Sequence, residues 1–239
     1  MNNELNKTAR IAGAIYLSLA LTAPFSQMYI PGKLIGRGDA TASAGNILNH
    51  ETLFRLGIVA DLFTSVIFIC VGLALYRLLR DVNKTWASAM VAFVLVSAGI
   101  GFLNVLNNIA ALILFRGAAF LAVFDKPQRD ALGMLFLRLH NHGEFINEIF
   151  WGVWLLPFGL LVYRSGFLPR FLGVWLIVNC FAYIALSLTA LLFPPYYERA
   201  FQMSMPVLFG ELAIILWLLI KGATPRLRSS NSFLNQATA

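Results

Sequence analysis

Six long apolar runs dominate the sequence and restrict what the chain can fold into. An α-helix rises about 1.5 Å per residue and the hydrocarbon of a bilayer is about 30 Å thick, so about 20 mostly apolar residues cross it. Runs of that length cover residues 11–30, 54–79, 86–115, 143–163, 171–193 and 201–220. We therefore predict an all-α integral membrane bundle with six transmembrane helices, formed as a single domain by residues 1–239.

The composition excludes one soluble globule. Hydrophobic residues make up 59% of the chain and charged residues 12%, against about 45–50% and about 25% in soluble domains. The net charge of +7 comes from basic residues in short links between apolar runs, which is typical of membrane topology rather than of nucleic-acid binding. The predicted partner is the lipid bilayer, and the predicted location is the cell (plasma or inner) membrane. Cys70 and Cys180 lie inside apolar runs and indicate no disulfide.

The charge distribution predicts the orientation. With six spans, both termini share one side with the links after the second and fourth spans, and that side carries ten basic and two acidic residues, a net of +8. The rest of the chain has eight basic and nine acidic residues, a net of −1. The positive-inside rule therefore places both termini in the cytoplasm, with residues 222–239 as a polar cytoplasmic tail. The first run has no suitable A-x-A-like cleavage site and is predicted to remain as a helix.

Two longer segments fall on the predicted external side. Residues 30–55 are predicted to form a loop that begins with turn residues. In residues 116–141, apolar side chains recur at helical spacing at Leu132, Leu135, Phe136 and Leu139. This pattern predicts a short external amphipathic helix at the interface before the fourth span.

Polar side chains inside the apolar runs gather toward the predicted external half. Counting residues from the helix starts places Asp61, Asn104, Asn107 and Asn108 near the outer boundary. The three asparagines share one helix face, so they either make interhelical hydrogen bonds or contact a ligand. The inner half is different, because almost no polar side chain occurs in residues 62–75, 90–96 and 153–162. We predict a polar cavity open to the exterior above an apolar cytoplasmic plug.

The stretch RLHNHGEFINEIFWG, residues 138–152, carries several titratable groups into the fourth span. At about 100° per residue, one helical stripe contains Asn141, Glu144, Glu148 and Trp151. His140 lies at the margin of this stripe, whereas His142 points about 160° away from Glu144. On one continuous helix the two histidines therefore cannot bind the same ion, although a turn at residues 141–143 would bring them together.

Two interpretations of this stretch follow. In the structural one, the histidines cap a helix at the interface, Glu148 is neutral or hydrogen-bonded to an asparagine, and Asp61 pairs with Arg55, Arg138 or an asparagine. In the chemical one, the carboxylates bind a ligand, act as acid and base, or hold a zinc-like ion that activates water. The ligand-binding candidates are Asn104, Asn107, Asn108, His140, Asn141, Glu144, Glu148, Tyr183 and Glu211. The catalytic candidates are Glu148, Asp61 and His142, and the metal candidates are His140, His142 and Glu144.

Two runs of the sequence also carry a family resemblance. GDATASAGNILNHETLFRLGIVADL (38–62) and IFWGVWLLPFGLLVYRSGFLPRFLGVWLIVNCFAY (149–183) resemble the bacterial and archaeal multi-pass proteins grouped as domain of unknown function 4386. The resemblance extends over roughly residues 8–222. It implies a single all-helical membrane domain, and it brings no catalytic or ligand-binding residue to this chain.

Three functions fit these observations. The first is binding or sensing of a small amphiphile or lipid head group in the polar cavity. The second is an intramembrane lipid hydrolase, with or without zinc, in which Glu148 and Asp61 act as acid and base and His140 or His142 assists. The third is a secondary transporter, suggested by the intramembrane carboxylates and disfavoured by the apolar inner half and the lack of an internal repeat.

Overall fold

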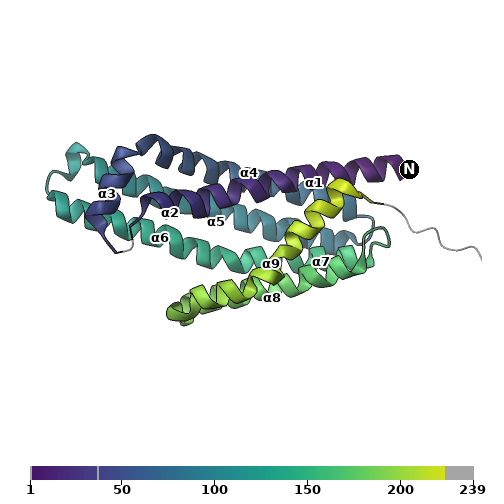
Figure 1. The fold of residues 1–239 in the computed structure, drawn as a ribbon. Coiled ribbons are helices and arrows are strands. Elements are labelled where there is room, and N and C mark those ends of the chain that lie inside the picture. The colour runs from purple at the N-terminus through teal and green to yellow at the C-terminus, as the bar shows by residue number, and fades with distance from the viewer. Residues whose placement is uncertain (1, 37, 224–239) are drawn as a thin grey trace, which may run out of the picture.

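The computed structural model describes residues 2–36 and 38–223, and every regular element in this part of the chain is a helix (Figure 1). The elements are α1 (Asn2–Pro24), a π-helical turn η1 (Phe25–Tyr29), α2 (Ile30–Leu34), α3 (Ala40–Asn49), α4 (Glu51–Leu79), α5 (Lys84–Arg116), a 3-10 turn η2 (Ala119–Leu121), α6 (Lys126–Val153), α7 (Leu155–Arg164), α8 (Arg170–Leu192), a 3-10 turn η3 (Pro194–Tyr196) and α9 (Tyr197–Ile220). The all-α prediction is confirmed. Most of the predicted polar tail, from residue 224 onward, lies outside the described residues.

Six helical segments are long and apolar enough to cross a membrane, as predicted. They are Asn3–Leu34, Glu51–Leu79, Lys84–Arg116, Lys126–Arg164, Arg170–Leu192 and Pro194–Ile220. Large apolar side chains cover their outward faces, and Phe63, Leu103 and Phe181 are each more than half exposed. A soluble protein does not expose so much contiguous apolar surface, whereas a bilayer solvates it.

The fourth span begins earlier than predicted. α6 follows Asp125, whose side chain accepts the backbone N–H of Gln128 while the Gln128 side chain accepts the N–H of Asp125. Residues 132–139 are helical, as predicted, but they form the first turns of α6 rather than a separate element. α6 continues through Gly143. Because this residue has no side chain, α6 lies directly against Asn104 of α5.

Prolines interrupt two of the spans. Pro157 has no N–H to donate to the carbonyl of Val153, and the fourth span is broken at Trp154 between α6 and α7. In the first span, the π-helical turn η1 separates Pro24 from Pro31. Turns of this kind are frequent at functional sites.

The predicted external loop contains a helix that sequence reasoning missed. α3 begins after Asp39, whose carboxylate accepts the N–H of Ala42, and it ends at His50, one residue before α4. Its buried residues Ala44 and Ile47 pack against the ends of the neighbouring spans. The prediction of a loop over residues 30–55 was therefore wrong. The turn residues at its start are followed by Asp39, which caps a helix.

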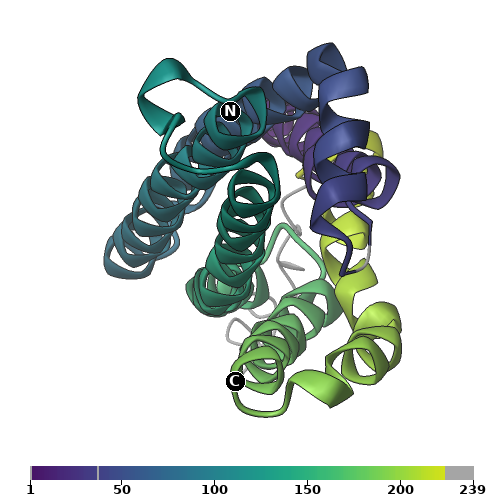
Figure 2. The ribbon, with the colours of Figure 1, turned by 90° about the vertical axis from the view of Figure 1, so that its left-hand side faces the viewer.

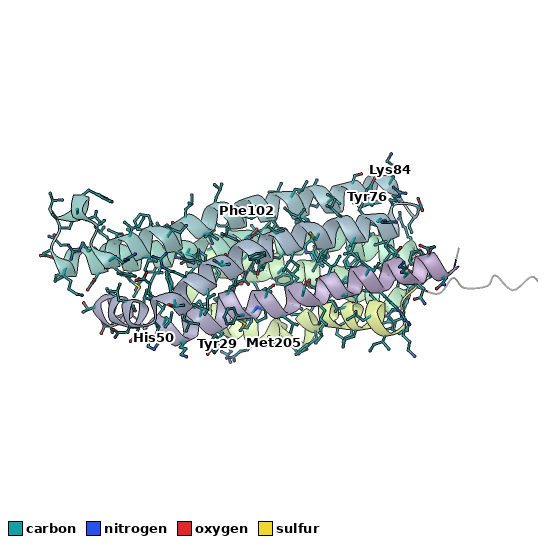
Figure 3. All side chains as sticks on the ribbon, turned by 90° about the horizontal axis from the view of Figure 1, so that it is seen from above. Tyr29, His50, Tyr76, Lys84, Phe102 and Met205 are labelled. Carbon is teal, nitrogen blue, oxygen red and sulfur yellow. The ribbon has the colours of Figure 1, made fainter. Side chains whose placement is uncertain are left out.

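The six spans form a closed ring when followed in the order of their contacts. α1 packs on α4, α4 on α5, α5 on α6, α6 on α8, α8 on α9, and α9 returns to α1 (Figure 2). The start of α1, the α4–α5 and α7–α8 links and the end of α9 lie together at one end of the bundle (Figure 1). Lys84 marks this end and His50 lies toward the opposite one (Figure 3). These gathered segments are those that the charge pattern assigns to the cytoplasm.

Two apolar cores divide the bundle along its length. The larger core fills the end that holds the start of α1 and the end of α9, and it includes Leu75, Met90, Phe158 and Leu218. The smaller one joins α2, α3 and the opposite ends of α4, α5 and α6. The apolar inner half predicted from the sequence is therefore present as the larger core, and the polar side chains of α4, α5 and α6 lie between the two cores.

Candidate functional site

A cavity of about 410 Å³ lies at the level between the two cores. It is lined by α1 with η1, α4, α5, α6, α8 and α9. Its polar lining consists of Tyr16, Gln27, Asp61, Thr64, Ser65, Ser97, Glu144, Asn147, Glu148, Tyr183 and Glu211. The polar cavity predicted from the sequence is thus found, with the fourth span as one wall.

The cavity opens between the first and last spans. Its exposed lining residues are Pro24, Met28, Met205, Phe209 and Leu212, all on α1, η1 or α9. The lining residues of α4, α5, α6 and α8 are buried or half-buried. The rim is therefore apolar and faces sideways, into the region that lipid occupies, whereas the sequence suggested an opening toward the aqueous exterior.

The geometry of α1 and α9 produces this opening. The two helices pack closely at the end of the bundle that holds the start of α1 and the end of α9. A Cβ on Gly13 would lie 2.9 Å from the Cβ of Leu218 there. Farther along, Tyr16 donates a hydrogen bond to Glu211. Beyond that contact α1 and α9 diverge (Figure 1), which leaves the cavity between them.

Side chains of α5 and α6 form a hydrogen-bonded network beside the cavity. The Asn104 amide donates to the carbonyl oxygen of His140 and to Glu144 Oε1, both at 2.9 Å. His140 Nδ1 lies 3.1 Å from the Asn104 carbonyl, which only accepts, and its Nε2 lies 3.3 Å from the Asn108 amide nitrogen. This pattern fits a neutral imidazole with the proton on Nδ1. From η1, Gln27 donates to Glu144 Oε2 at 3.2 Å.

Asp61 has a different partner from those predicted. Its Oδ2 lies 3.8 Å from Nε2 of His140, and Asp61 is buried. Arg55 instead pairs with Glu51 at 2.7 Å, because residues four apart share a helix face and residues six apart do not. No contact between Arg138 and Asp61 occurs among the described residues. The carboxylate of Asp61 therefore has a histidine as its neighbour.

Glu148 lies on the buried wall of the cavity and is only half satisfied. Tyr197, at the start of α9, donates to Glu148 Oε1 at 2.7 Å. Glu148 Oε2 is buried and has no hydrogen-bond partner among the residues that the structure describes. A buried polar atom without a partner costs free energy, which indicates that a donor from outside the chain belongs there. Thr64, which also lines the cavity, has an unpartnered hydroxyl as well.

Glu211 lies on the same cavity, closer to the larger core. The Tyr16 hydroxyl donates to its carboxylate, and the Tyr183 phenol lies beside it. The aromatic rings of Trp151 and Tyr183 meet edge to face, with centroids 6.2 Å apart. Aromatic rings and carboxylates therefore share this part of the cavity wall.

The lining carries acidic groups without basic ones. Four carboxylates line the cavity, those of Asp61, Glu144, Glu148 and Glu211, and no lysine, arginine or histidine is among its lining residues. Their hydrogen-bond donors are phenols and amides, which are uncharged. The cavity thus has an excess of negative charge when these groups are ionised.

The predicted ligand residues divide into two groups. The first group lines the cavity, as the ligand-binding prediction requires, and consists of Glu144, Glu148, Tyr183 and Glu211. The second group does not line it: Asn104 donates to Glu144, and Asn108 contacts His140, which lies next to Asp61. Two further candidates do not reach the cavity. Asn107 donates only to Asn104 within α5, and Asn141 is exposed and absent from the lining.

The metal candidates do not come together. His142 is exposed and its ring packs 5.8 Å from that of Phe145, whereas His140 faces α5. Because α6 is continuous through residues 141–143, the turn needed to bring both histidines to one ion does not form. Within residues 2–36 and 38–223 no three His, Cys, Asp or Glu side chains are arranged to hold a metal ion. This arrangement therefore does not place His140, His142 and Glu144 around one ion.

Sequence reasoning missed several residues of the site. Three of these residues come from the first and last spans, namely Gln27, Tyr16 and Tyr197. None of them belongs to a row of polar residues at helical spacing that the sequence analysis had identified. Asn147, which accepts a hydrogen bond from Ser97 at 2.8 Å, had a detectable signal, since it follows Glu144 by three residues on the same helix.

Comparison with known proteins identifies the family. The model of the domain of unknown function DUF4386 matches residues 11–222. The chain belongs to this family. A protein of Archaeoglobus fulgidus, described as uncharacterized, is 32% identical over 165 residues, which cover 69% of this chain and 83% of the relative. No solved structure matches the chain. The DUF4386 resemblance seen in the sequence is thereby confirmed.

Proposed function

We propose that this DUF4386 protein binds a small amphiphile that enters its cavity sideways from the bilayer. The polar groups of α4, α5 and α6 would receive the head group, and the apolar rim of α1 and α9 would hold the hydrocarbon part. The cavity volume of about 410 Å³ falls within the range of small-molecule sites, which is about 300–1,000 Å³. Such a cavity admits a head group with a short length of chain rather than a whole two-chain lipid.

One observation carries this proposal. Glu148 is a buried lining residue of a cavity with an apolar rim, and its Oε2 has no hydrogen-bond partner in the part of the chain that the structure describes. An apolar ligand would leave that oxygen unsatisfied, and a fully polar solute would gain nothing from Met28, Met205 and Phe209 at the rim. A molecule with one polar and one apolar end satisfies both parts of the cavity.

The topology proposed with this function follows from the charge pattern. Both termini and the basic links would face the cytoplasm of a cell-membrane protein, and the cavity would lie in the outer half of the bilayer. The larger apolar core would then separate the cavity from the cytoplasm. This arrangement favours binding or sensing over transport, because no lining residue of the cavity lies beyond Ile215 of α9 or Tyr16 of α1 toward that side.

The hydrolase alternative would use the same carboxylates. Asp61 beside His140 is the closest approach of a carboxylate and an imidazole in the described residues. Their separation of 3.8 Å is longer than a hydrogen bond, and neither histidine of α6 lines the cavity. Retained ester hydrolysis by a Glu148→Gln variant would exclude Glu148 as its acid or base.

The test of amphiphile binding fills the cavity from α1. Ala23 lines the cavity and Ala14 is exposed on the same helix without lining it. The protein is purified in mild detergent as wild type, Ala23→Phe and Ala14→Phe, and bound molecules are counted by native mass spectrometry after lipid extract is added. We expect wild type and Ala14→Phe to retain an amphiphile and Ala23→Phe to lose it. Equal retention in all three would overturn the proposal.

A further inference from the structure

We infer that the head group received by this cavity carries an ammonium group. The inference rests on the proposed function and specifies the chemistry of its ligand. It starts from the wall formed by Asp61, Glu144, Glu148 and Glu211, and from the absence of any basic side chain among the lining residues.

The unpartnered oxygen of Glu148 makes this wall more than an acidic cluster. Glu148 is 5% exposed, so its Oε2 cannot reach bulk water as surface carboxylates do. Its other oxygen already accepts from Tyr197. This oxygen can accept a hydrogen bond from a ligand, and a positively charged donor also offsets the buried negative charge, which a neutral one does not.

Within residues 2–36 and 38–223, no lining residue supplies such a charge. The basic neighbour of the carboxylates is His140, whose Nδ1 faces the Asn104 carbonyl and whose Nε2 faces the Asn108 amide. That arrangement accommodates the neutral ring. Lysine and arginine side chains are absent from the lining. A carboxylate buried with neutral donors alone is costly in a low-dielectric site, and a bound cation compensates for it.

The aromatic lining fits an ammonium group as well. Trp151, Tyr16 and Tyr183 line the cavity, and the two tyrosines lie beside Glu211. Faces of tryptophan and tyrosine attract desolvated cations, and aromatic cages recognise quaternary ammonium ligands. A phosphate or sulfate head group would meet four carboxylates and no basic partner, so anionic amphiphiles are disfavoured.

The test compares head groups on a constant chain. Dodecyltrimethylammonium, 1-O-dodecylglycerol and dodecyl phosphate are titrated by calorimetry into the full-length protein in a maltoside detergent. For wild type we expect the ammonium compound to bind at least about tenfold more tightly than the glycerol ether, as a desolvated cation among aromatic rings and carboxylates should. The phosphate compound should bind most weakly.

Two variants and a matched control locate the effect. Glu148→Gln should reduce affinity for the ammonium compound about tenfold and leave the glycerol ether unchanged. Glu198→Gln removes the same charge from an exposed position of α9 that does not line the cavity, and it should change neither. If Glu148→Gln does not fold, Glu211→Gln serves, since its amide oxygen still accepts from Tyr16.

The outcomes separate this inference from the proposed function. Equal affinity for the ammonium compound and the glycerol ether, unchanged in Glu148→Gln, would overturn the ammonium inference and leave amphiphile binding intact. Equal losses in Glu148→Gln and Glu198→Gln would overturn it too, because they would show only general attraction to an acidic surface. Failure of all three compounds to bind wild type would overturn both.

Discussion

Tyr197 donates a hydrogen bond to Glu148 Oε1 at 2.7 Å and so joins the start of α9 to the last turns of α6. The other oxygen of this carboxylate is buried and has no partner among the described residues, and Glu148 is a lining residue of the cavity. The bond therefore ties α9 to the wall that α6 contributes and leaves one oxygen of Glu148 without a donor.

The Tyr197→Phe variant should be destabilised. The substitution leaves both oxygens of the buried Glu148 carboxylate without a donor from the chain, at a cost of about 1–3 kcal/mol in the free energy of unfolding. Tyr196→Phe is the matched control, because Tyr196 is 62% exposed. Unfolding in mixed micelles with increasing dodecyl sulfate measures the difference. Equal stability of the two variants would contradict the role given to this bond.

The asparagines of α5 should differ in their effect on stability. Asn104 donates to α6 at two points, whereas Asn107 donates only within α5. Asn104→Ala should lower the free energy of unfolding by about 1–2 kcal/mol, the upper part of the range for interhelical hydrogen bonds in membranes. Asn107→Ala should change it by less than half as much. Unfolding in mixed micelles with increasing dodecyl sulfate measures both changes. A larger loss for Asn107→Ala than for Asn104→Ala would contradict the hydrogen-bonded network.

Glycine substitutions test how closely α5 and α6 approach. A Cβ on Gly143 would collide with the Asn104 side chain, which hydrogen bonds hold in place. Gly143→Ala should therefore be destabilised and show weaker α5–α6 packing. Gly99 has open space around its Cα, so Gly99→Ala should gain about 0.5–1 kcal/mol from its higher helix propensity. Thermal denaturation followed by circular dichroism shows whether each substitution raises or lowers the melting temperature. A higher melting temperature of Gly143→Ala would contradict the close approach of α5 and α6.

The two histidines of α6 should behave differently. His140→Ala removes the ring nitrogens that contact Asn104 and Asn108, and it leaves Asp61 without its histidine neighbour. The free energy of unfolding should therefore fall by about 1–3 kcal/mol. His142→Ala changes an exposed side chain and should alter stability by less than about 0.5 kcal/mol. Because the histidines do not share an ion, chelator should shift the melting temperature of neither variant. A chelator-sensitive melting temperature of the wild type, abolished in both, would restore the zinc interpretation.

Much of the architecture could be predicted from the sequence because the bilayer imposes a length and a polarity on each span. The six runs and the position of Glu144 and Glu148 on one stripe follow from 1.5 Å and 100° per residue, and both are confirmed. The lengths of the helices were less predictable. The capping box at Asp125 and Gln128 starts α6 outside the apolar run, where hydropathy gives no signal.

The tertiary part of the site could not be predicted in the same way. Helical periodicity identifies which residues share a face, but it does not say which face of another helix lies opposite. The structural interpretation paired Asp61 with Arg55, Arg138 or an asparagine, yet the fold brings His140 next to it. Likewise, the contacts of Tyr16 with Glu211 and Tyr197 with Glu148 join residues far apart in the chain. The sideways opening depends on how α1 and α9 diverge.

The orientation predicted from charge can be measured with single cysteines. Asp81, in the α4–α5 link, and Val123, between η2 and α6, are both highly exposed and lie at opposite ends of α5. Each is replaced by cysteine in a background that lacks Cys70 and Cys180. In intact cells a membrane-impermeant maleimide should label Val123→Cys and not Asp81→Cys. Labelling of Asp81→Cys alone would reverse the topology and place the cavity in the cytoplasmic half.

The central claim is that the cavity between α1 and α9 holds an amphiphile with its head group at Glu148. The most direct measurement is a crystal structure grown from a lipidic mesophase with dodecyltrimethylammonium present. The account predicts continuous elongated density that enters between Met28 and Met205 and ends beside Glu148 Oε2. Closure of α1 against α9 with the cavity filled by the chain's own side chains, or the compound bound only on the outer surface, would contradict it.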